Sequence, residues 1–572
     1  MTNRVFNDNY FWFAILVSIA CIILTNQFYK KNKLHVTDVL FGILSIYVFI
    51  NYYSLNGYTN LYWWFTLLMI PLYVSVRMIA ENELIRQWIL VFFLVAVLMQ
   101  ALLGLLQLYG LARSHHSLYK ITGTFFNPGP FSGFLAVGVP LALAFSLDMT
   151  LPRWVRLLGM TALATAVIVL PATMSRAAWI AAVVGCLPVW WKKLSAVSCQ
   201  LSASKIVSSI GGRIAVVSSI VLLMMALLSG AYFLKKDSAD GRRVIWYASM
   251  EAVKERPIFG AGYGRFAAVY GDAQATYFLE KERPANQVMV ADSPEFAFNE
   301  YVQIAVELGF VGLALFLLLT GSCFTNPRTL TTNHYALIAI LVFAAFSYPF
   351  SVLPLCIVFV FLLALSAPSS RKLTVSIPVW MKAVVVALCW GITAYSAIQI
   401  LPKRAAYREW SSLQKLYQLT AYNVVAKDYA ELYPKLRHEK NFLFEYGQCL
   451  SKTEQYAESN RIFEEYLHYG SDPMVYNCMG NNFKGMSEYD QAESMYIRAS
   501  QIVPNRHYPL YLLMKLYQEM EEEGKNGEAE KKAKAMAELL LKKPVKVLST
   551  AIREMHEGAK KVINQQPQNR SN

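Results

Sequence analysis

The chain has 572 residues, of which 55% are hydrophobic and only 16% are charged, and its formal net charge is +15. This composition is too apolar for a soluble protein of this size and is typical of a protein with many membrane spans. The basic excess does not indicate nucleic-acid binding. The cytoplasmic face of a membrane protein is expected to be basic, and no basic stripe alternates with stacking aromatic residues.

Apolar stretches long enough to cross a hydrocarbon core about 30 Å thick recur throughout residues 1–401. They predict an all-α, polytopic transmembrane domain of about twelve helices. The predicted spans cover residues 10–27, 36–54, 60–79, 87–111, 130–148, 154–172, 177–191, 213–234, 301–323, 334–350, 352–367 and 378–401. The stretches at 177–191 and 352–367 are short, so a re-entrant pair is an alternative. The first stretch is expected to be an uncleaved span, because no small-residue cleavage site follows it.

Lysine and arginine are unevenly distributed over the connections between these spans. One alternate set of connections is rich in them: Lys30, Lys31, Lys33, Arg77, Arg86, Arg153, Arg156, Lys192, Lys193, Lys205, Arg213, Arg328, Arg371 and Lys372. The other short connections hold little beyond Arg113, Lys120 and Arg176. Because positive charge is retained on the cytoplasmic side, residues 235–300 and everything after residue 402 are predicted on the opposite side.

Residues 235–300 form the one long polar loop between apolar stretches, and a lipid-embedded chain can place chemistry only in such loops or in cavities between spans. Arg242 and Arg243 lie near its start, and Arg176 lies at the same side of the membrane. The planar guanidinium suits phosphate oxygens, so these arginines are candidate ligands for a phosphate or pyrophosphate. The alternatives are an interfacial role for Arg176 and ion pairs of the other two with acidic neighbours, namely Asp237, Asp240 and Glu251.

The loop also contains the sequence PIFGAGYGRF, with Gly260, Gly262 and Gly264. It does not match a dinucleotide-binding loop, because the GxGxxG spacing and a preceding strand are both absent. A tight turn is the favoured interpretation. The turn can still hold Arg265, or backbone N–H groups, near an anion.

A group of polar residues precedes the predicted span at 301–323, in ADSPEFAFNEYVQ. Asp292 and Glu300 are candidate proton acceptors for a hydroxyl nucleophile, and Asn299 is a candidate to orient a sugar or peptide group. The alternative for each acid is a helix-start position favoured by the helix dipole.

The eight cysteines do not form a disulfide framework, since most lie in or beside spans. Cys449 and Cys478 lie outside the spans, and whether they pair is open. No CxxC or HExxH pattern occurs, and the adjacent His115 and His116 cannot share a helix face. Neither a metal site nor a cofactor is expected.

The composition changes near residue 402, where charged residues with helical periodicity replace the apolar runs. A 33-residue repeat relates Gly447 to Gly480 and Tyr456 to Tyr489, and the second copy resembles a tetratricopeptide repeat. Residues 402–545 are therefore expected to form a helical repeat domain, and residues 546–572 a tail with a disordered end. Such a domain offers either a surface for a protein partner or a scaffold for the loop.

Four sequence motifs, taken in order, resemble the O-antigen ligase family, which also contains bacterial O-oligosaccharyltransferases and polysaccharide polymerases. They are GTFFNPGPFSGFLA, SRAAW, GRRVIW with ERPIFGAGYGRF, and FNEYVQIAVELGFVGLALF. The resemblance implies a metal-independent, inverting glycosyltransferase of the bacterial inner membrane. It would take a glycan from undecaprenyl pyrophosphate on the periplasmic face. Arg176 and Arg242 match the two motif arginines that the family assigns to the pyrophosphate.

One position departs from the family pattern. The family usually has a histidine before the asparagine of the last motif, and this chain has Phe298 there. Phenylalanine cannot accept a proton. Either a neighbouring carboxylate replaces the histidine, with Glu300 expected ahead of Asp292, or the acceptor is activated differently, or the chain is not a typical ligase. The acceptor remains open between a glycolipid, a protein hydroxyl and the growing glycan. A non-catalytic assembly protein and a transporter are the alternatives, the latter disfavoured because no inverted repeat is seen.

Overall fold

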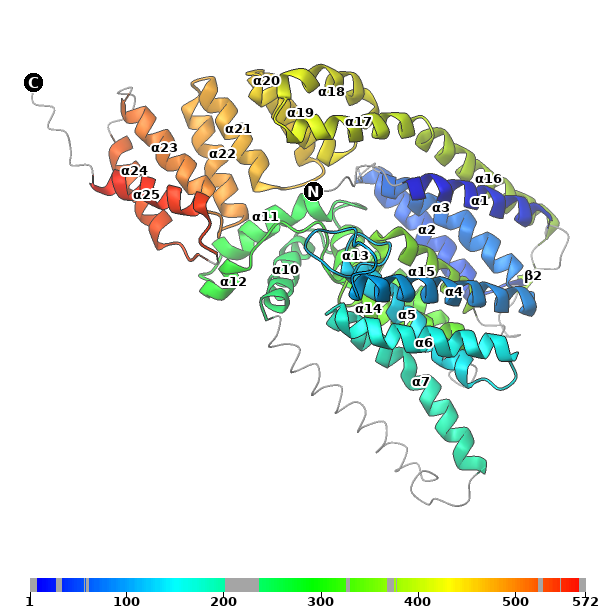
Figure 1. Ribbon diagram of the computed structural model, residues 1–572. Coiled ribbons are helices and arrows are strands. Elements are labelled where there is room, and N and C mark those ends of the chain that lie inside the picture. Colours follow the sequence, from blue (N-terminus) through cyan, green and yellow to red (C-terminus); the bar gives the residue numbers. More distant parts are fainter. Residues whose placement is uncertain are drawn as a thin grey trace, which may run out of the picture.

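The computed structural model describes residues 8–26, 33–55, 57, 61–200, 236–325, 330–367, 375–376, 378–522, 528–545 and 547–564 (Figure 1). Within these ranges the chain is almost wholly α-helical, apart from a short antiparallel pairing of β1 (Lys33–Leu34) with β2 (Val375–Ser376). The protein is therefore an all-α polytopic membrane protein, as the sequence predicts.

Every predicted span inside the described ranges overlaps a helix, although not every end agrees. The helices are α1 (Asp8–Asn26), α2 (Val36–Ser54), α3 (Leu61–Ile79), α4 (Glu83–Leu108), α5 (Pro128–Leu147), α6 (Arg153–Ala172), α7 (Arg176–Gln200), α13 (Glu300–Ser322), α14 (Thr332–Ala344), α15 (Leu353–Leu365) and α16 (Val379–Ile400). In the described chain, seven helices are long and apolar enough to cross a membrane, and three shorter apolar helices accompany them. The predicted span at 213–234 lies outside the described residues.

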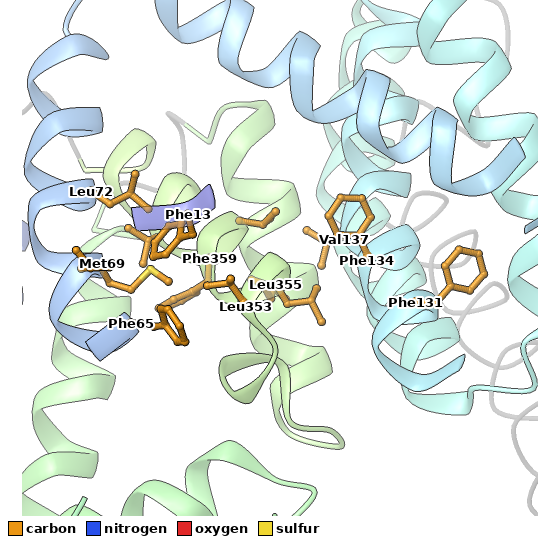
Figure 2. Packing of buried hydrophobic residues seen from close by; sticks show 14 of the residues in the cluster. Phe13, Phe65, Met69, Leu72, Phe131, Phe134, Val137, Leu353, Leu355 and Phe359 are labelled. Carbon is orange, nitrogen blue, oxygen red and sulfur yellow. The ribbon is translucent and has the colours of Figure 1, made fainter. Parts of the chain in front are cut away.

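Helix α5 lies at the centre of the membrane helices. Its apolar window is 89% buried, against 17% for α2 and 33% for both α4 and α6. Helices with so many exposed apolar side chains present them to lipid. Figure 2 shows Phe131, Phe134 and Val137 of α5 on one side of the core, with side chains of α1, α3 and α15 packed together on the other.

Helices α14 and α15 are half-length, and an irregular stretch joins them. Each has 13 residues, which at about 1.5 Å per residue gives about 20 Å, less than a full span. The predicted span at 334–350 is therefore wrong at its end, because the helix stops at Ala344 and residues 345–352, which we call the α14–α15 linker, contain only the short turn η2 (Pro349–Ser351). Irregular backbone at this depth requires protein partners for its polar groups.

The C-terminal region consists of helix pairs that follow α16 directly (Figure 1). They are α17 (Lys403–Gln418), α18 (Tyr422–Leu436), α19 (Lys440–Lys452), α20 (Tyr456–Leu467), α21 (Pro473–Gly485), α22 (Tyr489–Ile502), α23 (Tyr508–Glu522), α24 (Ala529–Lys542) and α25 (Thr550–Asn564). The turns within the first three pairs each contain one residue with positive φ, namely Thr420, Glu454 and Ser487. Gly447 of α19 packs against Phe463 of α20, and Gly480 of α21 packs against Tyr496 of α22 in the same way.

The polar loop at 235–300 is largely helical rather than extended. It folds into α10 (Lys236–Glu255), α11 (Phe266–Leu279) and α12 (Ala285–Met289). Its own small core contains Ile245 of α10 and the fully buried Phe266 and Tyr270 of α11, packed against Val306 of α13. The sequence did not show this, because the region has no apolar run long enough to stand out beside the membrane spans.

Helix α13 is broken at Gly309, where φ is 67° and ψ is −172°. The carbonyl oxygens of Val306 and Glu307 lose their helical partners at the break and instead accept from the backbone N–H groups of Ala261 (2.8 Å) and Gly262 (2.9 Å). Two N–H groups beyond the break donate to the same loop: Phe310 N to Pro257 O at 2.8 Å, and Val311 N to Ile258 O at 3.3 Å. The glycine-rich loop (residues 257–265) thus replaces the missing helical hydrogen bonds.

Glycine is required on both sides of this contact. A Cβ on Gly309 would lie 2.2 Å from the carbonyl oxygen of Ile258, and a Cβ on Gly260 would lie 2.4 Å from the carbonyl carbon of Glu307. Both glycines also have positive φ, a conformation that other residues adopt at a cost. The favoured interpretation of PIFGAGYGRF as a tight turn therefore agrees with its geometry.

We expect Gly309→Ala to destabilise the protein by more than about 2 kcal/mol, because the new Cβ would collide with rigid backbone at a left-handed position. Thermal unfolding of purified protein in detergent measures the effect. The control is Gly321→Ala in the same helix, where a Cβ meets nothing within 4 Å. An unchanged melting temperature for Gly309→Ala would show that the loop does not clamp the break.

Candidate functional site

Two of the candidate arginines, Arg176 and Arg242, lie near enough to act on each other electrostatically. Arg176 begins α7, and Arg242 lies near the start of α10. Burial and, second, the positive charge of Arg176 lower the pKa of Arg242, while Tyr348 of the α14–α15 linker opposes this shift. Arginine nevertheless stays charged at physiological pH. Two like charges held close in a partly buried place are unfavourable unless an anion joins them, so the arrangement is suited to an anionic ligand.

The guanidinium of Arg242 is oriented by main chain and by an aromatic ring. Its Nη1 donates to the carbonyl oxygen of Phe346 at 2.9 Å, and its Cζ lies 5.3 Å from the ring centroid of Phe298. Among the described residues, no carboxylate pairs with Arg242. Its charge is therefore not neutralised within this part of the chain, which leaves it available for a ligand.

Phe298, at the position of the family histidine, has an unusual backbone. Its φ is 53°, and a non-glycine residue held in the left-handed region costs about 1–3 kcal/mol. The neighbouring residues hold it there: Trp246 Nε1 donates to Ala297 O at 2.9 Å, and Ala297 N donates to Gln303 Oε1 at 3.2 Å. Asn299 is the N-cap of α13, where its Oδ1 accepts from the N–H groups of the second and third helical residues.

The other two arginines are placed differently. Arg243 has a 59% exposed side chain and pairs with Asp240 at 3.8 Å, one of the alternatives that the sequence leaves open. Arg265 is the N-cap residue of α11, and its Nη1 donates to Leu55 O, just beyond α2, at 3.3 Å. Burial and the charge of Arg256 lower its pKa. Arg265 therefore lies with α2 and the glycine-rich loop rather than beside Arg242.

The two candidate carboxylates lie in opposite environments. Glu300 is 3% exposed, accepts from Phe350 N at 2.7 Å, and faces a cavity of about 160 Å³ that Gln303, Glu307 and Tyr263 also line. The side chain of Asp292 is 66% exposed and pairs with Arg506 at 3.0 Å. Only Glu300 is thus enclosed close to the α14–α15 linker.

The C-terminal helices fix the backbone that leads into α13. The buried Gln274 of α11 donates from Nε2 to Asp292 O at 3.0 Å and to Ile502 O at 2.6 Å. The amide of Asn505 donates to Met289 O (3.0 Å) and Ala291 O (2.8 Å), and Lys440 pairs with Glu295 at 3.1 Å. The segment carrying Asp292, Phe298 and Asn299 is therefore held from two sides.

Glu307 is a residue that the sequence analysis missed. Its carboxylate is buried and accepts from Gly264 N (2.8 Å), Phe266 N (3.3 Å) and Gln303 Nε2 (3.3 Å). The glycine-rich loop does bind an anion with its backbone, but the anion is a side chain of the same protein. The available signal was an acid in the middle of an apolar span, a rare feature that usually has a role.

Within the described part of the chain, no three His, Cys, Asp or Glu side chains lie close enough together to bind a metal ion. Cys449 and Cys478 are both buried free thiols. The pairing that the sequence left open is therefore not formed in this structure.

We expect Glu307→Gln to destabilise the protein by about 1–3 kcal/mol, because an amide nitrogen would replace one oxygen that now accepts backbone N–H groups. Thermal unfolding measures this. Glu295→Gln is the control, since that acid is 55% exposed in a surface ion pair and should change stability by less than about 1 kcal/mol. Equal effects of the two substitutions would contradict a clamping role for Glu307.

Comparison with known protein families gives a match inside the membrane domain. The model of the family described as O-antigen ligase matches residues 160–317, from α6 into α13. No curated protein matches the chain. The matched range contains Arg176, Arg242 and the N-cap of α13, so the resemblance seen in the motifs is confirmed where these groups lie. Residues 160–317, which we call the O-antigen ligase-type region, are therefore similar to the O-antigen ligase family.

Proposed function

We propose that the protein transfers a glycan from undecaprenyl pyrophosphate to an acceptor hydroxyl on the periplasmic face of the inner membrane. The observation that carries this proposal is that Arg176 and Arg242 act on each other electrostatically inside the O-antigen ligase-type region. Two guanidinium groups can bind the oxygens of a pyrophosphate through paired charge-assisted hydrogen bonds. They also stabilise the charge that develops on the leaving group.

In the proposed reaction the acceptor oxygen attacks the anomeric carbon of the first sugar from the face opposite the pyrophosphate. The bond between that carbon and the phosphate oxygen breaks. Attack from the opposite face inverts the configuration, and undecaprenyl pyrophosphate is the leaving group, bound by the two arginines. The acceptor proton must go to a base, and Phe298 cannot accept it. We assign this role to Glu300, directly or through one water in its cavity, with no metal ion in the step.

Asp292 is the less favoured base. Its side chain is exposed and forms an ion pair with Arg506. Glu300 and Arg242 instead both bind the α14–α15 linker. Glu300 accepts a hydrogen bond from Phe350 N, and Arg242 donates one to Phe346 O. This common segment connects the proposed base with the proposed pyrophosphate site.

A polysaccharide polymerase of the same family is the second candidate, and it would differ only in using the growing glycan as the acceptor. Phe298 also favours, more weakly, a non-catalytic assembly protein. We propose that residues 402–545 form a tetratricopeptide-like unit that holds the loop and offers a surface to a protein. A glycolipid, a protein and a glycan, each offered as acceptor to purified enzyme with the lipid-linked donor, would separate these possibilities.

We expect Arg242→Ala to lower glycan transfer by at least about a hundredfold with normal protein levels, because hydrogen bonds to a charged group are worth about 1.5–3 kcal/mol each. Arg242→Lys should rescue poorly, since it keeps the charge but not the fork. The assay is transfer from purified lipid-linked glycan, and Arg176→Ala should behave similarly. The matched control is Arg243→Ala, one residue away and 59% exposed. A near-normal rate for Arg242→Ala would remove this arginine from the donor site.

We expect Glu300→Gln to lower the transfer rate by about 10²–10⁴-fold, the usual contribution of a positioned base, while Asp292→Asn stays near the parental rate. Both substitutions keep side-chain shape, so they separate proton transfer from packing. Adding Phe298→His to Glu300→Gln tests whether the family histidine can restore a base. Parental rates in Glu300→Gln would show that the acceptor loses its proton elsewhere.

A further inference from the structure

Three aromatic residues form a connected group next to Arg242, and of these the sequence singled out only Phe298. We call Phe296, Phe298 and Tyr348 the aromatic trio. The rings of Phe296 and Tyr348 stack with centroids 4.9 Å apart and an interplanar angle of 9°, and Phe298 meets Tyr348 edge to face at 5.2 Å and 87°. The guanidinium of Arg242 lies over Phe298 at 5.3 Å. The three rings and the guanidinium of Arg242 thus form one connected group.

Burial does not account for the trio. All three side chains are only partly buried, and Phe296 and Tyr348 lie outside the hydrophobic clusters of the described chain. Phe298 is held at a φ of 53°, and strained backbone of this kind is concentrated at functional sites. Tyr348 comes from the α14–α15 linker, which Arg242 and Glu300 bond near its two ends.

The chemistry of the neighbouring charges indicates what the trio would bind. In a lipid-linked glycan the first sugar is joined directly to the pyrophosphate. It must therefore lie next to the side chains that bind the phosphates. One face of a pyranose ring consists largely of C–H groups, which suit an aromatic surface, while its hydroxyls can bond a phenol. Tyr348 offers both a ring and a phenol, and it also acts electrostatically on Arg242.

We propose that the aromatic trio is the binding site for the sugar joined to the pyrophosphate, with Tyr348 as the residue that contacts it most. This proposal rests on the proposed function, because it places the sugar by reference to a pyrophosphate on Arg176 and Arg242. The position of the family histidine is then occupied by a residue that recognises the shape of the sugar rather than one that moves a proton.

Binding measurements with two probes test the proposal on the full chain in lipid nanodiscs. One probe is undecaprenyl pyrophosphate without sugar, and the other is the same lipid with its glycan. We expect Tyr348→Leu to weaken binding of the glycan-bearing lipid about three- to tenfold and to leave the sugar-free lipid unchanged. Tyr348→Phe, which keeps the ring, should lose less. Arg242→Ala should weaken both probes.

Phe310→Leu is the matched control, because it also removes a partly exposed ring but lies beyond the break in α13. Phe296→Leu provides the same test if Tyr348→Leu does not fold. Equal weakening of both probes, or no weakening of either, would overturn the sugar site while a loss in Arg242→Ala still supports the proposed function. Binding that is insensitive to Arg242→Ala in both probes would overturn the pyrophosphate site and, with it, this proposal.

Discussion

The structure around the candidate site depends on one constraint, which is that polar backbone inside a membrane domain must find its partners within the protein. The helical order fails at two places, at Gly309 in α13 and in the α14–α15 linker. At the first, the glycine-rich loop supplies the missing hydrogen bonds. At the second, the side chains of Arg242 and Glu300 bond the carbonyl of Phe346 and the N–H of Phe350. Arg242 and Glu300, the two candidates for chemistry, therefore also bind the irregular backbone of the linker.

This double role connects regions that are far apart in the sequence. The glycine-rich loop fixes Glu307 and the break in α13, and Glu300 begins the same helix. The C-terminal helices reach the same helix from the other side, through the bonds of Gln274 and Asn505 to the backbone before it. The C-terminal region is therefore joined to the segment that precedes Phe298 by hydrogen bonds that do not involve the lipid-facing helices.

The sequence predicted those features that depend on local composition. The length of the apolar stretches located the helices of the membrane domain. The arginines of SRAAW and GRRVIW were recognised from their positions, one at the end of a span and the other at the start of the long polar loop. It did not predict that residues 236–289 are largely helical, that α14 ends at Ala344, or that Glu307 is the anion held by the glycine-rich loop. Each of these is decided by contacts between residues far apart in the chain. Tyr348 was missed because a tyrosine at the end of an apolar stretch is unremarkable until its neighbours are known.

The replacement of histidine by Phe298 is best understood from these contacts together. A histidine there would sit over Arg242 and beside Tyr348, where the two positive charges of the arginine pair would disfavour its protonated form. Phenylalanine removes that conflict and adds a ring that the guanidinium can cover. In the proposed mechanism the proton is accepted instead by Glu300, whose carboxylate accepts a hydrogen bond from Phe350 N of the α14–α15 linker. In the proposed mechanism, the substitution would thus separate recognition of the donor from proton transfer, two tasks that a histidine at this position would have to combine.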